Sequence, residues 1–181
     1  MEKLSALTPG IWNVDPAHSA LGFAVRHLMV SKIRGKFEIF EGTITIAADP
    51  LQSSVSASAD TASVHTNDKS RDNHLRTSDF FEAEKFPKLT FVSTSIEADG
   101  DDYKLHGDLT IKGTTKPVSF DLELEGVVQD PWGHSRAGFT AETEVNRKDW
   151  GLDYNAVLEA GGVMIGEKVK LTLEIEAIKK S

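Results

Sequence analysis

The chain has 181 residues, which is the size of one ordinary domain. Hydrophobic residues make up 39%, and the 14 glycines raise the apolar share to about 47%, which excludes disordered and collagen-like chains. The absence of cysteine excludes a disulfide scaffold, thiolate chemistry and cysteine-ligated metal. The net charge of −8 predicts repulsion from nucleic acid and from anionic membrane surfaces.

The ends and hydropathy of the chain give an expectation about its location. No apolar run approaches the roughly 20 residues that a membrane-spanning helix needs. The first ten residues, MEKLSALTPG, lack the basic and apolar stretches of a secretory signal peptide. We therefore expect a cytoplasmic protein without stable membrane insertion, with an N-terminal tail at residues 1–9 and one domain at 10–181.

Apolar residues recur at every second position over most of the chain, which is typical of half-buried strands. Glycine at position 42 predicts a bulge or bend in the second of these strands. Roughly eight strands are expected on this pattern, at residues 21–25, 36–46, 53–62, 89–93, 103–111, 118–124, 137–145 and 169–177.

The segments between these strands are short and contain Gly, Pro or Asp, as in 49–50, 99–101, 112–113 and 130–133. Short links favour antiparallel neighbours, because parallel pairs need long crossovers. Closing eight antiparallel strands into a barrel removes the exposed sheet edges. The fold class is therefore predicted as all-β, an extended eight-stranded antiparallel barrel.

One stretch departs from the strand pattern. Residues 67–86 read NDKSRDNHLRTSDFFEAEKF, and Asn67 or Asp68 is suited to cap a helix there. We expect a short helical insertion between two strands.

The expected inward faces combine large and small side chains. Small residues such as Gly107 and Ser93 cannot fill a barrel alone, whereas several phenylalanines occupy alternating positions. An eight-stranded barrel is either filled by its own side chains or holds one small ligand. The pattern leaves open whether large and small residues interdigitate in a tight core or enclose an apolar cavity. The residues expected along an apolar ligand tail are Phe23, Val25, Phe37, Ala57, Ala59, Phe91, Leu109, Phe120, Phe139 and Ala141.

Few residues suggest chemistry. The six histidines form no H-x-H, H-x-x-x-H or HExxH pattern, and no G-x-S-x-G, Walker or G-x-G-x-x-G motif occurs, so no catalytic residue, cofactor or metal site is predicted. His27 continues the inward series of its strand. Arg71 and His74 share one face of the expected helix and suit a phosphate or carboxylate. We expect His27, Arg71 and His74 to contact a polar head group, although a satisfied core histidine and a solvated helix face are the alternatives.

Four stretches resemble the YceI family, a lipocalin-like group: residues 12–44, 70–96, 107–126 and 137–152. The resemblance runs from about residue 10 to 178. Many family members carry a signal peptide, and this sequence shows none. The resemblance implies an extended eight-stranded antiparallel barrel with a helical insertion, which holds one amphiphile such as a polyisoprenoid or a long-chain fatty amide or acid.

We expect a non-enzymatic protein that carries or sequesters a long-chain apolar ligand, with a polyisoprenoid or related lipid as its partner. Two alternatives stay open. One is an enzyme acting on an isoprenoid lipid, for which His27 or His74 with Asp72 is the only evident acid–base pair. The other is a ligand-free, stress-related barrel that acts through its surface. The sequence does not decide whether the protein forms a homodimer.

Overall fold

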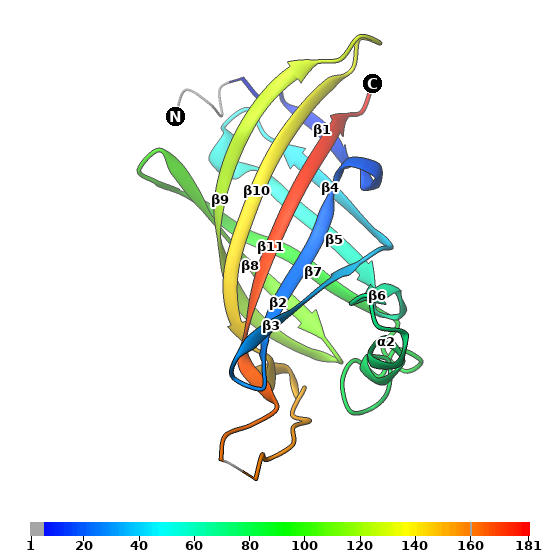
Figure 1. Cartoon of the computed structure of the whole chain (residues 1–181). Coiled ribbons are helices and arrows are strands. Elements are labelled where there is room, and N and C mark those ends of the chain that lie inside the picture. Colours follow the sequence, from blue (N-terminus) through cyan, green and yellow to red (C-terminus); the bar gives the residue numbers. More distant parts are fainter. Residues whose placement is uncertain (1–5, 160) are drawn as a thin grey trace.

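The computed structural model describes residues 6–159 and 161–181 and is a closed eight-stranded antiparallel barrel with one short α-helix, as predicted (Figure 1). Alternating apolar residues form its strands, because alternation turns one face of each strand inward. The strands are β1 Gly10–Val14, β2 Ala20–His27, β3 Ser31–Phe37, β4 Phe40–Ile46, β5 Ser54–Asp60, β6 Val64–His65, β7 Lys88–Asp99, β8 Asp102–Ile111, β9 Thr114–Gln129, β10 Ser135–Asn146 and β11 Ile165–Lys179.

Three of the eight barrel strands are interrupted, which is why eleven strands build them. The strand order is β1-β4-β5-β7-β8-β9-β10-β11-β2-β3-β6, and β1 also pairs with β11. The 3₁₀ helix η1, Pro16–His18, separates β1 from β2, and η3, Thr61–Ser63, separates β5 from β6. β1 and β2 both pair with β11, and β4 and β3 continue beside them. The barrel closes through this shared pairing with β11.

The two ends of the barrel differ (Figure 1). One end, here called the helix end, carries the β2–β3 turn, the helix α2 and the 147–164 connection. The opposite end, the termini end, carries the C-terminus together with the β7–β8 and β9–β10 turns. Leu7 is buried at the termini end of the core, so part of the expected tail packs onto the barrel.

The helical insertion contains α2, Lys69–Leu75, and Asp68 caps it by accepting a hydrogen bond from the backbone N–H of Arg71 at 2.9 Å. The remaining helical segments are η2, Pro50–Gln52, and η4, Arg147–Trp150. Within the described ranges, no helix has the length and hydropathy needed to cross a membrane.

The predicted bulge at Gly42 is wrong, because β4 and β5 stay in regular register through Gly42 and Ala57. A Cβ at position 42 would lie 2.9 Å from a methyl of Val14, so glycine is there for close packing. Register shifts occur instead at Ser93/Ser95, Gly138/Phe139 and Ile165/Val169.

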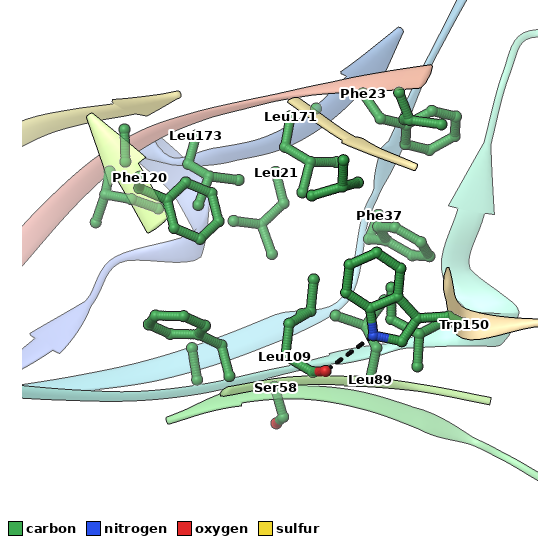
Figure 2. A pocket seen from close by; sticks show the side chains of 18 of the residues that line it. Leu21, Phe23, Phe37, Ser58, Leu89, Leu109, Phe120, Trp150, Leu171 and Leu173 are labelled. Carbon is green, nitrogen blue, oxygen red and sulfur yellow. Dashed lines mark hydrogen bonds between the residues drawn. The ribbon is translucent and has the colours of Figure 1, made fainter. Parts of the chain in front are cut away.

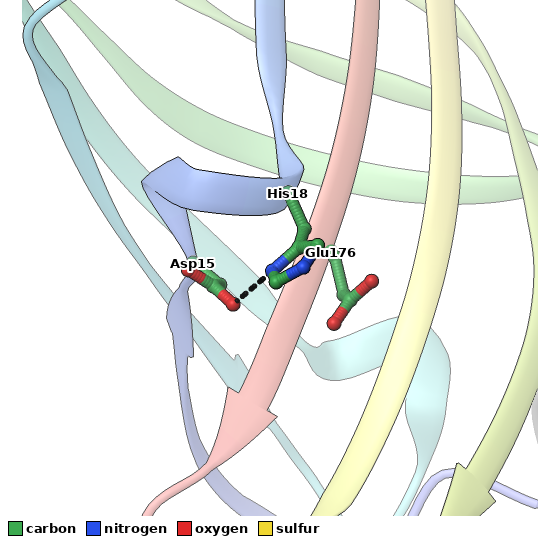
Figure 3. A group of neighbouring side chains, drawn as sticks. All are labelled: Asp15, His18 and Glu176. Carbon is green, nitrogen blue, oxygen red and sulfur yellow. Dashed lines mark hydrogen bonds and ion pairs between the residues drawn. The ribbon is translucent and has the colours of Figure 1, made fainter.

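A charged cluster ties the β1–β2 interruption to the termini end of β10 and β11, and Figure 3 shows three of its members, Asp15, His18 and Glu176. Arg136 on β10 donates from Nε to Asp130 at 2.7 Å, and from Nη1 to Glu176 at 2.6 Å and to Asp15 at 3.2 Å. His18 Nδ1 lies 2.8 Å from the Asp15 carboxylate. These contacts link three chain segments that are distant in sequence, and they reinforce the barrel where β1 breaks.

The cluster favours the ionised forms of Asp15 and Asp130. Hydrogen bonding from His18 is the main reason that the pKa of Asp15 is lowered. Burial raises the pKa of Asp130, but bonds from Arg136 and from the backbone N–H groups of His134 and Trp132 outweigh burial and lower this pKa to about 2. The carboxylates in turn raise the pKa of Arg136.

Replacement of Arg136 by methionine removes the cation shared by three carboxylates, so we expect Tm to fall at neutral pH. In the native protein, Asp130 stabilises the fold above its unfolded pKa of 3.8, and this contribution is lost as pH falls through about 2. The acid-side loss of stability should therefore weaken in Arg136→Met. Thermal unfolding followed by circular dichroism between acid and neutral pH measures both effects.

Lys104→Met is the matched control, because Lys104 forms exposed ion pairs with Asp99 and Asp121 near the same end of the barrel. Exposed pairs contribute about 0–1 kcal/mol, so its Tm should change little. An equal fall in Tm for both variants would contradict the role given to the Arg136 cluster.

Candidate functional site

The barrel encloses an apolar cavity of about 390 Å³, within the roughly 300–1,000 Å³ typical of small-molecule sites. Side chains from different walls point into this space, and Figure 2 shows Leu171 and Leu173 of β11 facing Leu109 of β8 across it. Trp150 of η4 stands at one side and donates from Nε1 to the carbonyl oxygen of Leu109 at 2.9 Å (Figure 2). The walls thus offer a long-chain ligand contacts with carbon rather than with charge.

Nine of the ten residues expected along a ligand tail line this cavity. The exception is Ala59, which is fully buried and packs with Phe37 and Val64 instead of facing the space. Ala59 pairs with Phe40 on one side and Leu89 on the other, so its methyl group is covered by the wall. The lining residues from the prediction are Phe23, Val25, Phe37, Ala57, Phe91, Leu109, Phe120, Phe139 and Ala141.

Aromatic side chains occupy part of the space beside the small inward residues. A Cβ at Gly107 would lie 2.4 Å from the Phe91 ring, and one at Gly35 would lie 2.4 Å from the Phe23 ring. Gly107 therefore creates room for a phenyl group, not for ligand. Ser93 accepts a hydrogen bond from the backbone N–H of Val55 at 2.7 Å and does not line the cavity. The interior therefore combines the two arrangements that the sequence left open, interdigitation at the wall and a cavity at the centre.

The three residues expected near a head group all line the cavity, and they approach it from two sides of the helix end. His27 ends β2, opposite Ile165 of β11 and Ser31 of β3. Arg71 approaches from α2, where it donates from Nε to the hydroxyl oxygen of Thr66 at 2.8 Å and from Nη2 to the carbonyl oxygen of Thr66 at 2.7 Å. The structure thus places a cation and an imidazole at one end of an apolar space.

His74 links α2 to the 147–164 connection. Its Nε2 lies 2.7 Å from a carboxylate oxygen of Asp79, and its ring packs edge-on against Tyr154 and Phe80 at centroid distances of 4.7 and 5.1 Å. Asp72 does not pair with His74. Its carboxylate instead accepts from the backbone N–H and hydroxyl of Thr66 and lies 3.5 Å from His65. The acid–base pair that the enzyme alternative drew from His74 and Asp72 is therefore not assembled.

Arg147 is a buried cation in the cavity wall that the sequence analysis missed. Its guanidinium donates to the backbone carbonyl oxygens of Leu152, Ile165 and Gly166. Burial lowers the pKa of Arg147, while Glu167 and Asp153 raise it. Arg147 continues the inward series of odd positions in β10, and this alternation was the available signal.

Tyr103 is a second polar group that the sequence analysis missed. It lines the cavity from β8 and is only 3% exposed, and its hydroxyl has no hydrogen-bond partner among the described residues. Tyr103 lies near the β7–β8 turn, at the end of the barrel opposite His27. A buried, unpaired hydroxyl costs roughly 1–3 kcal/mol, so a polar atom of a ligand would relieve this cost.

Asp15, His18 and Glu176 bring three potential metal-ligand atoms within 4.8 Å of one another (Figure 3). Arg136 already donates to the carboxylates of Asp15 and Glu176, so a protein cation offsets part of their negative charge. The group does not line the cavity. We assign these residues a structural role.

Comparison with known proteins agrees with the geometry. Residues 12–177 match the YceI-like domain. Protein YceI of Escherichia coli is 39% identical over 164 residues, which cover 90% of this chain and 83% of that protein. The crystal structure of BcnA from Burkholderia cenocepacia superposes with a TM-score of 0.76 at 24% identity, covering 90% of this chain and 98% of that one.

A third protein with the same fold is a polyisoprenoid-binding domain from Saccharophagus degradans. It superposes with a TM-score of 0.72 at 16% identity, covering 96% of this chain and all of that domain. The family match extends over nearly the whole barrel, from β1 to β11. The chain therefore belongs to the YceI family.

Proposed function

We propose that this protein binds a polyisoprenoid or related long-chain lipid inside its barrel and carries or sequesters it. The single observation that carries the proposal is the central cavity of about 390 Å³, whose walls are mostly apolar. Family membership and the polyisoprenoid-binding description of the structurally similar Saccharophagus degradans domain support a ligand-binding role and this ligand class.

Burial of the tail accounts for useful affinity without special polar contacts. Each buried methylene contributes about 0.8 kcal/mol. Ten of them therefore contribute about 8 kcal/mol before the entropic cost of binding, which corresponds to micromolar affinity. A tail of a few isoprene units reaches this size.

Polar groups would then set the direction of the ligand. His27, Arg71 and His74 are the proposed head-group contacts, and the position of Arg147 in the same end of the cavity adds a buried cation to them. The remaining N–H groups of the Arg147 guanidinium suit an oxygen of a phosphate, carboxylate or hydroxyl. The head group is therefore proposed to lie at the helix end.

The role is proposed as non-catalytic, and the proposed location is the cytoplasm. The His74 ring pairs with Asp79 and packs against the rings of Phe80 and Tyr154. Recovery of a bound lipid chemically unchanged after prolonged incubation tests the absence of catalysis, and conversion of that lipid would support the enzyme alternative.

Ala57→Trp should block the ligand tail. Ala57 lines the cavity from β5, and an indole there would occupy the space of several methylenes. We expect affinity for a prenyl lipid such as farnesol to fall at least about tenfold, as loss of two buried methylenes alone implies. Fluorescence competition binding and thermal unfolding measure affinity and fold.

Ser56→Trp provides the matched control, because Ser56 is the preceding residue on β5, is exposed and does not line the cavity. It should bind like the unmodified protein. Unchanged affinity in a folded Ala57→Trp variant would show that the ligand does not occupy this cavity.

Tyr103→Phe tests whether the Tyr103 hydroxyl contacts a polar atom of the ligand. Removal of the unpaired hydroxyl should leave the empty protein as stable or about 1 kcal/mol more stable. We expect roughly fivefold weaker binding of an α,ω-oxygenated long-chain lipid and unchanged binding of squalene. Isothermal titration with the two lipids measures the difference, and an equal effect on both would exclude a polar contact at Tyr103.

A further inference from the structure

The turn between β2 and β3 exposes apolar side chains at the helix end of the barrel. Met29 is 60% and Val30 81% exposed, and Leu28 is also exposed. Val157, 85% exposed, lies in the neighbouring 156–164 segment, where Gly162 faces the Met29 sulfur and Met164 accepts from the Leu28 N–H. We call these four residues the tip patch.

Turn chemistry does not account for the tip patch. The carbonyl oxygen of His27 accepts from the backbone N–H of Val30, and Leu28 and Met29 both have positive φ, at 50° and 60°. Such a turn favours Asn and Gly, which tolerate the left-handed region. Large apolar side chains held there in the open are therefore better explained by a partner than by folding.

Exposed cations follow the tip patch along the outer face of the same hairpin. Arg26 lies directly opposite Lys32, Arg34 lies opposite Ala24, and Lys36 lies opposite Gly22. We call Arg26, Lys32, Arg34 and Lys36 the cation ladder. No carboxylate lies within ion-pair distance of any of them in the part of the chain that the structure describes.

The local charge is opposite to the charge of the whole chain. Residues 20–37 hold four of the 20 Lys and Arg and none of the 28 Asp and Glu. Like charges directly opposite on paired strands are destabilising, so the Arg26–Lys32 pair lowers the stability of the hairpin in isolation. Attraction between these cations and an anionic surface would offset their mutual repulsion. The net charge of −8 predicts repulsion of the whole chain from such surfaces, and it does not reveal that residues 20–37 carry only positive charge.

We propose that the tip patch and the cation ladder form a reversible docking surface for a bilayer that contains anionic lipids. Apolar side chains at a tip flanked by Lys and Arg match the two layers of such a surface, acyl chains below and phosphates above. A nucleic acid would use the cations but leave the tip patch in water. Asp153 and Glu159, exposed in the 147–164 connection, limit the attraction and favour reversible binding.

Docking in this way would turn the helix end toward the membrane. His27 ends β2 immediately before the tip patch and lines the cavity, and so do Met164 and Ile165 of the adjoining segment. A long-chain lipid leaving the bilayer would meet the cavity lining over a short path. The docking surface nevertheless consists of exposed residues of the β2–β3 hairpin together with Val157, and it does not require the cavity to hold a ligand.

Sedimentation with phosphatidylcholine vesicles, with and without phosphatidylglycerol, tests the proposal on the full-length protein. We expect binding to the anionic vesicles only, lost at high salt as the Debye length falls from about 30 Å at 0.01 M to about 3 Å at 1 M. Lys32→Glu should weaken this binding at least about fivefold. Val30→Asp should weaken it about tenfold, since it removes the most exposed apolar side chain of the turn.

Matched controls carry the same changes at the other end of the barrel. Trp132→Asp alters an apolar side chain that is 77% exposed in the β9–β10 turn, and Lys180→Glu alters an exposed lysine after β11. Both should bind vesicles like the unmodified protein. Because all four sites are exposed, we expect the four variants to fold. Circular dichroism verifies this.

Besides an absence of vesicle binding, two results would overturn the proposal. One is equal binding by the hairpin variants and their controls. The other is binding of duplex DNA as tight as that of anionic vesicles and insensitive to Val30→Asp, which would assign the ladder to a nucleic acid. Uptake of farnesol without binding to vesicles would support the cavity function and contradict the docking surface. Binding to vesicles without uptake of farnesol would support the docking surface and contradict the cavity function.

Discussion

An eight-stranded barrel encloses more volume than the inward side chains of this sequence fill, and the rest of the structure depends on that mismatch. Alternation turns one residue in two toward the axis, and some of these residues, such as Ala57 and Ala141, have small side chains. Phe23 and Phe91 fill the gaps beside Gly35 and Gly107, yet a central apolar space is left. An apolar ligand can bind favourably in this space, because water finds few hydrogen-bond partners in an apolar cavity.

Closure of the barrel keeps that space intact. β11 pairs with β10 along one side and with both β1 and β2 along the other, so the interruption between β1 and β2 leaves no open edge. The Arg136 cluster lies at this interruption and ties Asp15 to Glu176 of β11. Polar interactions therefore secure the wall from outside, whereas the inner surface stays almost wholly apolar.

The sequence predicted much of the fold because period-two alternation is a local signal. This signal predicted the barrel class, and nine of the ten residues expected along a ligand tail line the cavity; the helix was predicted from its capping residues, of which Asp68 is the cap. Alternation did not predict the lining correctly where contacts between distant segments or a bulge change which residues reach the cavity. Ala59 has the inward phase but is covered by neighbouring strands, and the β7 bulge near Ser93 lets both Phe91 and Ile96 line the cavity. Arg147 and Tyr103 were missed because burial, not residue type, makes them notable.

The central claim is that a long-chain lipid occupies the cavity, and native mass spectrometry of the protein purified from its own host tests it most directly. The account predicts a stoichiometric adduct that solvent extraction releases as a polyisoprenoid or related long-chain lipid. A mass without adduct, unchanged after incubation with prenyl and fatty lipids, would contradict the account and favour a barrel that acts through its surface.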